Sequence, residues 1–230
     1  MYIKNNLKRS VFIIGALFFS FNLRFASAND FYISPLLIHI VPVEKEEPFV
    51  TNLNNSVVPG MDLNASNETL PALGLTYMWN DYWAIEVYLS MPPTHDLYIS
   101  GLPNIDKAAT ADILPAVVFV QYHYPIPKSD FTLTGGVGAF YAMFQDIKLT
   151  EDVKQLDPSI EFIANDEPGF AFQVGLLYSL NDKFYLRAHY AKMYLEVDFQ
   201  ISTAIPTLGN LSSALTMDPE LYMLGIAYKL

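Results

Sequence analysis

The sequence predicts an all-β protein, an eight-stranded antiparallel up-and-down transmembrane β-barrel with short periplasmic turns and long extracellular loops. Three observations predict it: apolar residues recur at every second position, short and long connections alternate, and aromatic residues gather beside the short connections. Of the 230 residues, 52% are hydrophobic and 16% are charged. No mature segment offers the roughly 20 consecutive apolar residues that a spanning helix needs.

The N-terminus has the pattern of a secretory signal peptide. A basic start with Lys4, Lys8 and Arg9 precedes the apolar run SVFIIGALFFSF, and the small-residue sequence ASA ends at Ala28. We expect cleavage after residue 28, which leaves residues 29–230 as an outer-membrane β-barrel. An uncleaved anchor helix is the weaker alternative, because the run is short and Arg24 interrupts it.

The charge of the chain restricts its partners. The formal net charge is −11, and it becomes −15 without residues 1–28, which hold four cations and no anions. A chain this acidic lacks the basic surface that binds nucleic acid. The predicted partners are outer-membrane lipids and lipopolysaccharide, and contact with the latter would need divalent cations.

The mature chain divides into strand pairs joined by tight turns. The first pair covers residues 73–91 and turns at Asn80 and Asp81. Similar pairs turn at Pro125–Asp130 and at Asn181–Asp182. A first strand near Phe31–Val43 and a last strand near Leu221–Leu230 bring the total to about eight, with boundaries uncertain by about two to four residues.

The connections between these pairs are long and polar. They are predicted at Glu44–Glu68, Pro93–Ala111, Ile147–Pro168 and Ser202–Thr216. Short turns at one end and long loops at the other are typical of an outer-membrane barrel. In hydrocarbon every backbone donor must be paired, so the last strand must bond to the first.

An aromatic girdle is predicted at the short-turn end. Its members lie on the apolar face next to a short turn or the C-terminus, where hydrocarbon meets the lipid head groups. They are Trp79, Trp83, Tyr124, Tyr178, Phe184 and Tyr228.

One strand changes its alternation. Its apolar residues share one parity from Phe184 to Tyr190 and the opposite parity from Met193 to Phe199. An inserted residue would exchange the two faces, so we predict a β-bulge near Ala191 and Lys192. The alternative is that Lys192 lies at the outer membrane interface.

Six segments together resemble the outer membrane protein W (OmpW) family. They are FYISP at 31–35, GLTYMWNDYWAIEV at 74–87, LPAVVFVQYHY at 114–124, GGVGAFYAMFQD at 135–146, FQVGLLYSLNDKFYL at 172–186 and DPELYMLGIAYKL at 218–230. The resemblance implies an eight-stranded barrel with a narrow, hydrophobic interior, uptake of small hydrophobic molecules and a part in envelope stress responses. It also implies an assembly signal for the outer-membrane assembly machinery at Gly225, Tyr228 and Leu230, although the family usually ends in an aromatic residue.

The inward-facing positions supply the predicted lumen lining. Eight are apolar, which suits a hydrophobic path or a packed, closed lumen better than a water-filled pore: Leu36, Ile38, Ile40, Val117, Phe119, Phe140, Phe144 and Leu177. Six are polar and lie toward the short turns: Glu86, Gln121, His123, Gln173, Arg187 and His189. The polar set is either a gate or a satisfied buried network, and the network is favoured.

Catalysis, metal binding and cofactors are not predicted. The four histidines are scattered, no G-x-S-x-G motif occurs, and the pair His95 and Asp96 is a weak signal for a nucleophile's base. The acidic segment 147–168 lacks the spacing of a calcium loop. We therefore expect a monomeric barrel that gives small hydrophobic molecules a narrow route; the alternative is a closed structural or adhesin-type barrel whose extracellular loops bind surfaces or hosts.

Overall fold

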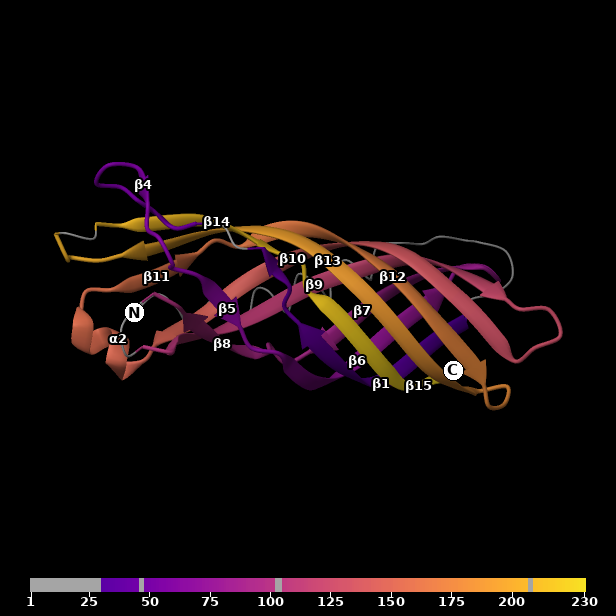
Figure 1. Cartoon of the computed structure of the whole chain (residues 1–230). Coiled ribbons are helices and arrows are strands. Elements are labelled where there is room, and N and C mark those ends of the chain that lie inside the picture. The colour runs from indigo at the N-terminus through magenta and orange to yellow at the C-terminus, as the bar shows by residue number, and fades with distance from the viewer. Residues whose placement is uncertain (1–29, 46–47, 102–104, 207–208) are drawn as a thin grey trace, which may run out of the picture.

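A closed antiparallel barrel of eight long strands forms the body of the molecule. The computed structural model describes residues 30–45, 48–101, 105–206 and 209–230, so the predicted signal peptide lies outside the described residues. The strands follow one another around the barrel in chain order (Figure 1). They are β1 (Asp30–Val41), β6 (Glu68–Met78), β7 (Trp83–Ser90), β9 (Lys107–Pro125), β10 (Phe131–Leu149), β12 (Glu167–Ser179), β13 (Phe184–Ser202) and β15 (Glu220–Lys229).

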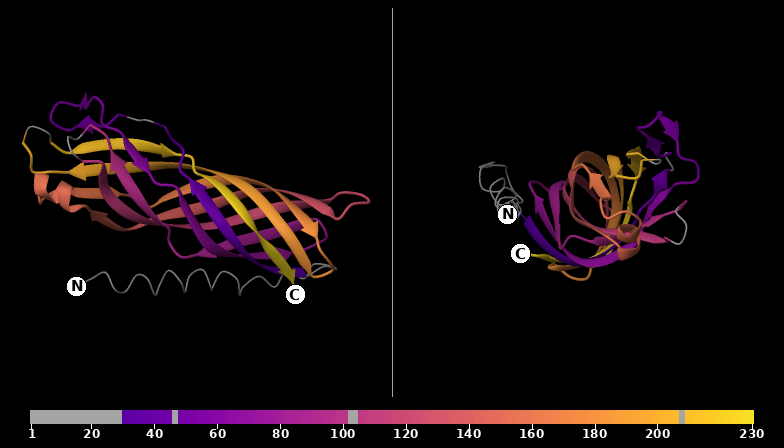
Figure 2. Two further views of the ribbon diagram at one scale, coloured as in Figure 1. Left: turned by 60° about the horizontal axis from the view of Figure 1, so that its bottom comes forward. Right: turned by 90° about the vertical axis from the view of Figure 1, so that its left-hand side faces the viewer.

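The last strand closes the barrel against the first, as the sequence predicts. β15 pairs with β1 from Tyr32↔Lys229 to Val41↔Glu220, and β12 pairs with β13. The view along the axis in Figure 2 shows the sheet rolled into a ring. Gly225 permits this closure, because a Cβ there would lie 2.4 Å from the carbonyl oxygen of Pro35.

The predicted long loops are in part regular structure, which corrects the sequence-based boundaries. Their residues form β8 (Thr94–Ile99) and β14 (Leu211–Met217), the short strands β2 (Glu44–Lys45), β3 (Val50–Thr51), β4 (Ser56–Val57), β5 (Leu63–Ala65) and β11 (Glu161–Ala164), and helix α2 (Glu151–Leu156). Some of these strands prolong the registers of the barrel strands, whereas the pairings of β8 with β9 and of β11 with β13 are offset by one residue. The pairing of β14 with β2, for example, continues that of β15 with β1. Extended chain beside an unpaired strand edge satisfies its backbone by pairing, whatever its side-chain pattern.

The bulge predicted near Ala191 and Lys192 is wrong. β13 pairs Lys192 with Glu220 and Leu195 with Met217 in one uninterrupted register, and the amide of Met193 donates to the carbonyl of Pro219 at 3.0 Å. Odd-numbered residues of β13 face inward along its whole length. The surroundings of the strand change near Lys192. On the short-turn side of Lys192 the outer face is apolar, and on the long-connection side Glu196, Asp198 and Gln200 point outward.

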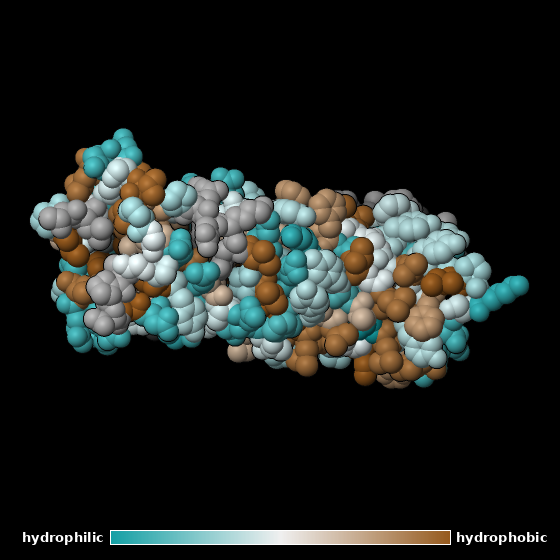
Figure 3. Space-filling model, in the orientation of Figure 1, coloured by the Kyte–Doolittle hydropathy of each residue, from teal (hydrophilic) through white to brown (hydrophobic). Residues whose placement is uncertain are grey.

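The outer surface is apolar over the half that ends in the short turns. Leu224 is 66% exposed and Val174 is 58% exposed, although both lie in the middle of strands. In Figure 3 brown and pale side chains cover this half, whereas the other half mixes brown with teal. No helix in the described part of the chain is long and apolar enough to cross a membrane.

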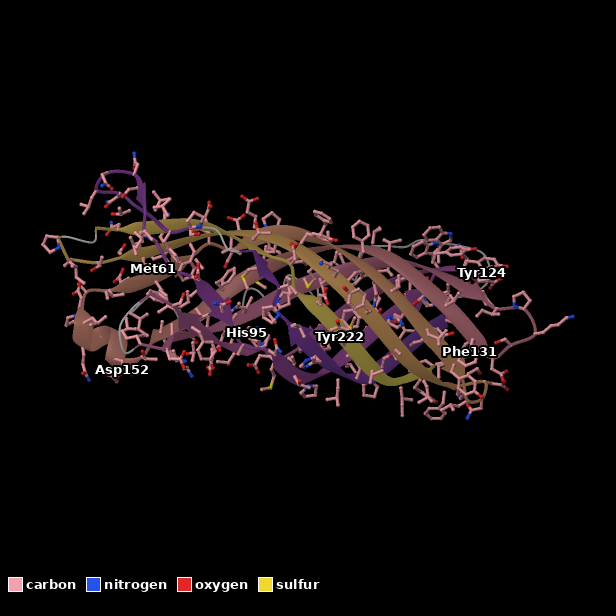
Figure 4. All side chains as sticks on the ribbon, viewed as in Figure 1. Met61, His95, Tyr124, Phe131, Asp152 and Tyr222 are labelled. Atoms are coloured by element: carbon pink, nitrogen blue, oxygen red, sulfur yellow. The ribbon has the colours of Figure 1, made fainter. Side chains whose placement is uncertain are left out.

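Aromatic side chains border this apolar band. Tyr124 and Phe131 lie at the short-turn end, and Tyr222 lies near the middle of the molecule (Figure 4). Of the residues predicted for the girdle, Trp79 stacks on Trp83 at 6.3 Å between ring centroids, and Phe184 contacts Tyr228 at 5.0 Å. A second group, which the sequence analysis missed, contains Tyr190 beside Tyr222 and Tyr194 stacked on Phe170. The signal was available for Phe170, Tyr190 and Tyr222, which share the lipid-facing parity, whereas the predicted bulge would have turned Tyr194 inward.

Candidate functional site: a two-zone barrel interior

A buried ion pair crosses the lumen in the short-turn half. Arg187 Nη1 on β13 donates to Glu86 Oε1 on β7 at 2.6 Å, and the two side chains are 3% and 0% exposed. β7 and β13 are four strands apart in either direction around the barrel. They are therefore diametrically opposite, and the ion pair spans the full width of the lumen.

Neighbouring hydroxyl and amide groups satisfy the remaining lone pairs of Glu86. Oε1 also accepts from the hydroxyl of Thr76 at 2.9 Å, and Oε2 accepts from the hydroxyl of Tyr88 at 2.7 Å and from Gln121 Nε2. A buried carboxylate is tolerated only with such compensation. The charge of Glu86 is thus held by four donors from three other strands and its own.

Two glutamines and two histidines extend this network across the barrel. Gln121 Nε2 donates to Gln173 Oε1 at 2.7 Å, and His123 Nε2 donates to Gln121 Oε1 at 2.9 Å. Gln173 Nε2 at 2.7 Å and Arg187 Nη2 at 3.0 Å both point at His189 Nδ1, which must therefore accept. We call the seven residues Glu86, Tyr88, Gln121, His123, Gln173, Arg187 and His189 the polar cluster.

The structure brings all six predicted polar lumen residues together in this cluster. Each is less than 10% exposed, and the network connects them from one wall to the other. Tyr88, a member of the polar cluster, and Thr76, which bonds to it through Glu86, were not predicted from the sequence. Their inward parity was visible, but nothing in the sequence says that a phenol and a hydroxyl will lie beside Glu86.

On the long-connection side of the polar cluster, the interior of the barrel is apolar. A cavity of about 60 Å³, which we call the upper cavity, touches β1, β8, β9, β10, β13, β14 and β15. Its lining consists of Ile40, Pro42, Pro93, His95, Ile113, Pro115, Phe140, Ala142, Phe144, Met193, Leu195, Met217, Pro219 and Leu221. A smaller cavity of about 20 Å³ lies beside it and shares Ile113, Phe144 and Met217 with it.

The predicted apolar lumen residues occupy several levels of this interior. Ile40 and Phe140 line the upper cavity, and Phe144 lines both cavities. Leu36, Ile38 and Phe119 are buried, Val117 is partly buried against them, and Leu177 is partly exposed. Met193 and Leu195 were missed, because the predicted bulge would have turned them toward lipid.

The barrel wall is interrupted beside the upper cavity. β7 pairs with β9 up to Val87↔Val118, and β8 pairs with β9 from Thr94↔Asp112 onward. Between these levels the amide of Ile113 donates to the carbonyl of Pro93 at 3.1 Å. Pro93 and Pro115 have no backbone N–H with which to extend the ladder.

The candidate catalytic pair and the acidic segment have other roles in the structure. His95 is buried, whereas Asp96 points outward and binds Lys107 at 2.6 Å, so the two form no dyad. Asp157, beyond α2, accepts hydrogen bonds from Ser159, Thr203 and Ala204, which lower the pKa of its carboxyl to about 2. Among the described residues, no group of three or more histidine, aspartate or glutamate side chains could hold a metal ion.

A closed antiparallel barrel with an apolar outer band, short turns at one end and long connections at the other is a transmembrane β-barrel of the outer-membrane type. The chain belongs to the OmpW family, whose sequence profile matches residues 27–230. The short turns are therefore periplasmic and the long connections extracellular.

Relatives and solved structures agree with this assignment. Outer membrane protein W of Salmonella typhi is 26% identical over 204 residues, which cover 88% of this chain and 89% of that protein. Outer membrane protein AlkL of Ectopseudomonas oleovorans is 23% identical over 181 residues, or 77% of this chain and 73% of that protein. The crystal structure of OprG from Pseudomonas aeruginosa superimposes with a TM-score of 0.79 at 24% identity and covers 91% of this chain and 99% of that one.

Proposed function

We propose that this barrel gives small hydrophobic molecules a narrow route from the outside into the outer membrane. The observation that carries the proposal is the sequence of zones in the lumen: two adjoining apolar cavities end above a charge pair that spans the full width of the barrel. An apolar molecule gains by leaving water for such cavities and gains nothing by displacing a satisfied ion pair. The polarity falls from the extracellular water to the two cavities, which favours binding of an apolar molecule on the extracellular side of the polar cluster.

The interrupted wall supplies the exit. Because the polar cluster blocks the axis, a molecule in the upper cavity has its nearest apolar surroundings through the gap between β7 and β9. The outward residues there are Leu89, which is 43% exposed, and Met91, which is 79% exposed. A molecule leaving through this gap enters the hydrocarbon of the bilayer without meeting water.

Cross-linking tests the route, because the chain contains no cysteine. Leu89→Cys with Ala116→Cys places one thiol on each side of the gap, and a cleavable bifunctional thiol reagent joins them. Uptake of octane into vesicles with lipopolysaccharide in the outer leaflet should fall to the protein-free rate and recover after cleavage. The matched control is Ile85→Cys with Val120→Cys, a paired position on the same two strands, whose cross-link should leave uptake unchanged.

Two results would contradict the proposal. Folded wild-type protein that never accelerates octane uptake removes the transport function and favours the surface-binding alternative. Uptake that continues through the cross-linked barrel removes the lateral exit alone.

A further inference from the structure

Among the residues that the structure describes, His95 has the one polar side chain that lines the upper cavity. It lies on β8, on the long-connection side of Tyr222 (Figure 4), is 5% exposed, and shares the cavity with thirteen apolar residues, four of them prolines. Among the described side chains, no acidic or basic group lines the cavity with it: Asp96 binds Lys107 on the outer face, and Asp112 accepts from Thr94 at 2.6 Å. The transport route proposed above gives this histidine no role.

Its hydrogen bonding determines which ring nitrogen is free. Nδ1 lies 2.8 Å from the carbonyl oxygen of Ser66. A carbonyl only accepts, so Nδ1 carries the proton, and in the neutral ring Nε2 is then an acceptor with a free lone pair. Within the described chain no group bonds to Nε2.

An accessible acceptor on a side chain that lines an apolar cavity favours a ligand that brings one donor. An alkane leaves Nε2 unsatisfied. A carboxylate has no proton to give and would lose its hydration in an apolar site. A neutral hydroxyl satisfies the lone pair while its hydrocarbon chain covers the apolar lining.

We propose that His95 Nε2 accepts a hydrogen bond from the head group of the transported molecule, so that the preferred cargo is a neutral amphiphile with an apolar chain and a single donor, such as a medium-chain primary alcohol. This proposal rests on the proposed function, since the cargo occupies the same cavity. A cavity of about 60 Å³ admits about two water volumes, which is room for a hydroxyl and its first carbons. Met193 and Met217 are among the other lining residues, and their flexible side chains give way to a longer chain.

Nitrogen NMR of the full-length protein in lipid nanodiscs tests recognition directly. With ¹⁵N-labelled histidine, the Nε2 resonance of His95 should move upfield and saturate as 1-octanol is added, and it should not move with octane. His39, His123 and His189 serve as internal references, and His95→Gln identifies the resonance. A His95 resonance that octanol leaves unmoved overturns the proposal, whatever the uptake of octane.

Uptake rates test its consequence for selectivity. The wild-type ratio of octanol uptake to octane uptake should fall about tenfold in His95→Phe, which corresponds to one net hydrogen bond. His95→Gln should keep the ratio, because its amide can both donate to Ser66 and accept from the alcohol. It also guards against a folding defect in the phenylalanine variant. The matched control His39→Phe changes an outward-facing histidine bonded to Thr69 at 2.7 Å and should have no effect on the ratio.

The two proposals fail separately. A ratio that His95→Phe leaves unchanged overturns the role of His95, whereas a wild-type barrel that accelerates neither solute overturns transport. In the second case the NMR titration still decides whether His95 binds an alcohol.

Discussion

Glu86 and Arg187 show why a charge pair can persist inside a membrane barrel. Both side chains are almost fully buried, and each is bonded to more than its ionic partner. A buried pair often contributes little net stability, but the loss of one partner leaves an uncompensated charge. The pair therefore spans the lumen and is sensitive to single substitutions.

Arg187→Met should lower the free energy of unfolding by about 3–5 kcal/mol, because it leaves Glu86 buried without its cation. Adding Glu86→Leu should recover most of this loss. Urea unfolding in phospholipid vesicles measures both, and planar-bilayer recordings should show higher ion conductance in the double variant. Lys192→Met is the control: its 3.7 Å contact with Glu220 is partly exposed, so the change should stay below about 1 kcal/mol. If the double variant loses as much free energy of unfolding as the sum of the losses in Glu86→Leu and Arg187→Met, the two charges are not coupled.

The seam between β1 and β15 is the element on which closure depends. Every long strand has two neighbours only because these two pair over their length. Gly225 lies at this seam opposite Leu36, and a side chain there would meet Pro35 O at 2.4 Å and Leu36 Cβ at 2.5 Å. The glycine that the family resemblance places in an assembly signal thus also has a packing reason in the folded barrel.

Gly225→Ala should lower the free energy of unfolding by about 1–3 kcal/mol, because backbone atoms of β1 would have to move. Gly135→Ala is the matched control, since a Cβ at this position of β10 would have no atom within 4 Å. It should change the stability by less than about 0.5 kcal/mol. Urea unfolding in vesicles and heat-dependent gel mobility measure the two side by side. Equal stability of the two variants would show that the seam tolerates a side chain.

The barrel has two halves with different surroundings, one in lipid and one in water, built on continuous strands. β13 belongs to both, which is why its apolar residues exchange faces near Lys192 while its register continues. On the short-turn side of Lys192, lipid contacts the apolar outer face. On the long-connection side, water contacts the outer face, and Val197, Phe199 and Ile201 belong to an apolar core inside.

An arginine scan along the outer face of β13 should locate this boundary. Ala188→Arg, in the middle of the apolar band, should cost about 2–4 kcal/mol of unfolding free energy, because the charge would lie in hydrocarbon. Gln200→Arg, with the same outward parity twelve residues further on, should cost less than about 0.5 kcal/mol. The measurement is urea unfolding in vesicles. Similar costs at both positions would show that the two ends of β13 share one environment.

Much of this architecture was predictable from local pattern. The period of two gave the strands, the alternation of short and long connections gave the topology, and the parity of Glu86 and Arg187 placed both inside. The bulge predicted in β13 is absent because the prediction assumed that lipid contacts the apolar face of the strand along its whole length. The predicted loop at Pro93–Ala111 failed in part because β8 pairs through its backbone, which leaves little trace in side-chain order.

Alternation along the chain was enough to establish a lipid-facing barrel, because side chains in strands take opposite faces in turn and the bilayer accepts only an apolar one. The pairing of Glu86 with Arg187 across the lumen, the interrupted wall and the position of His95 depended on the closed fold. These features join residues from strands far apart in the chain, and contacts across a barrel follow from its closure and register, which no local stretch of sequence encodes.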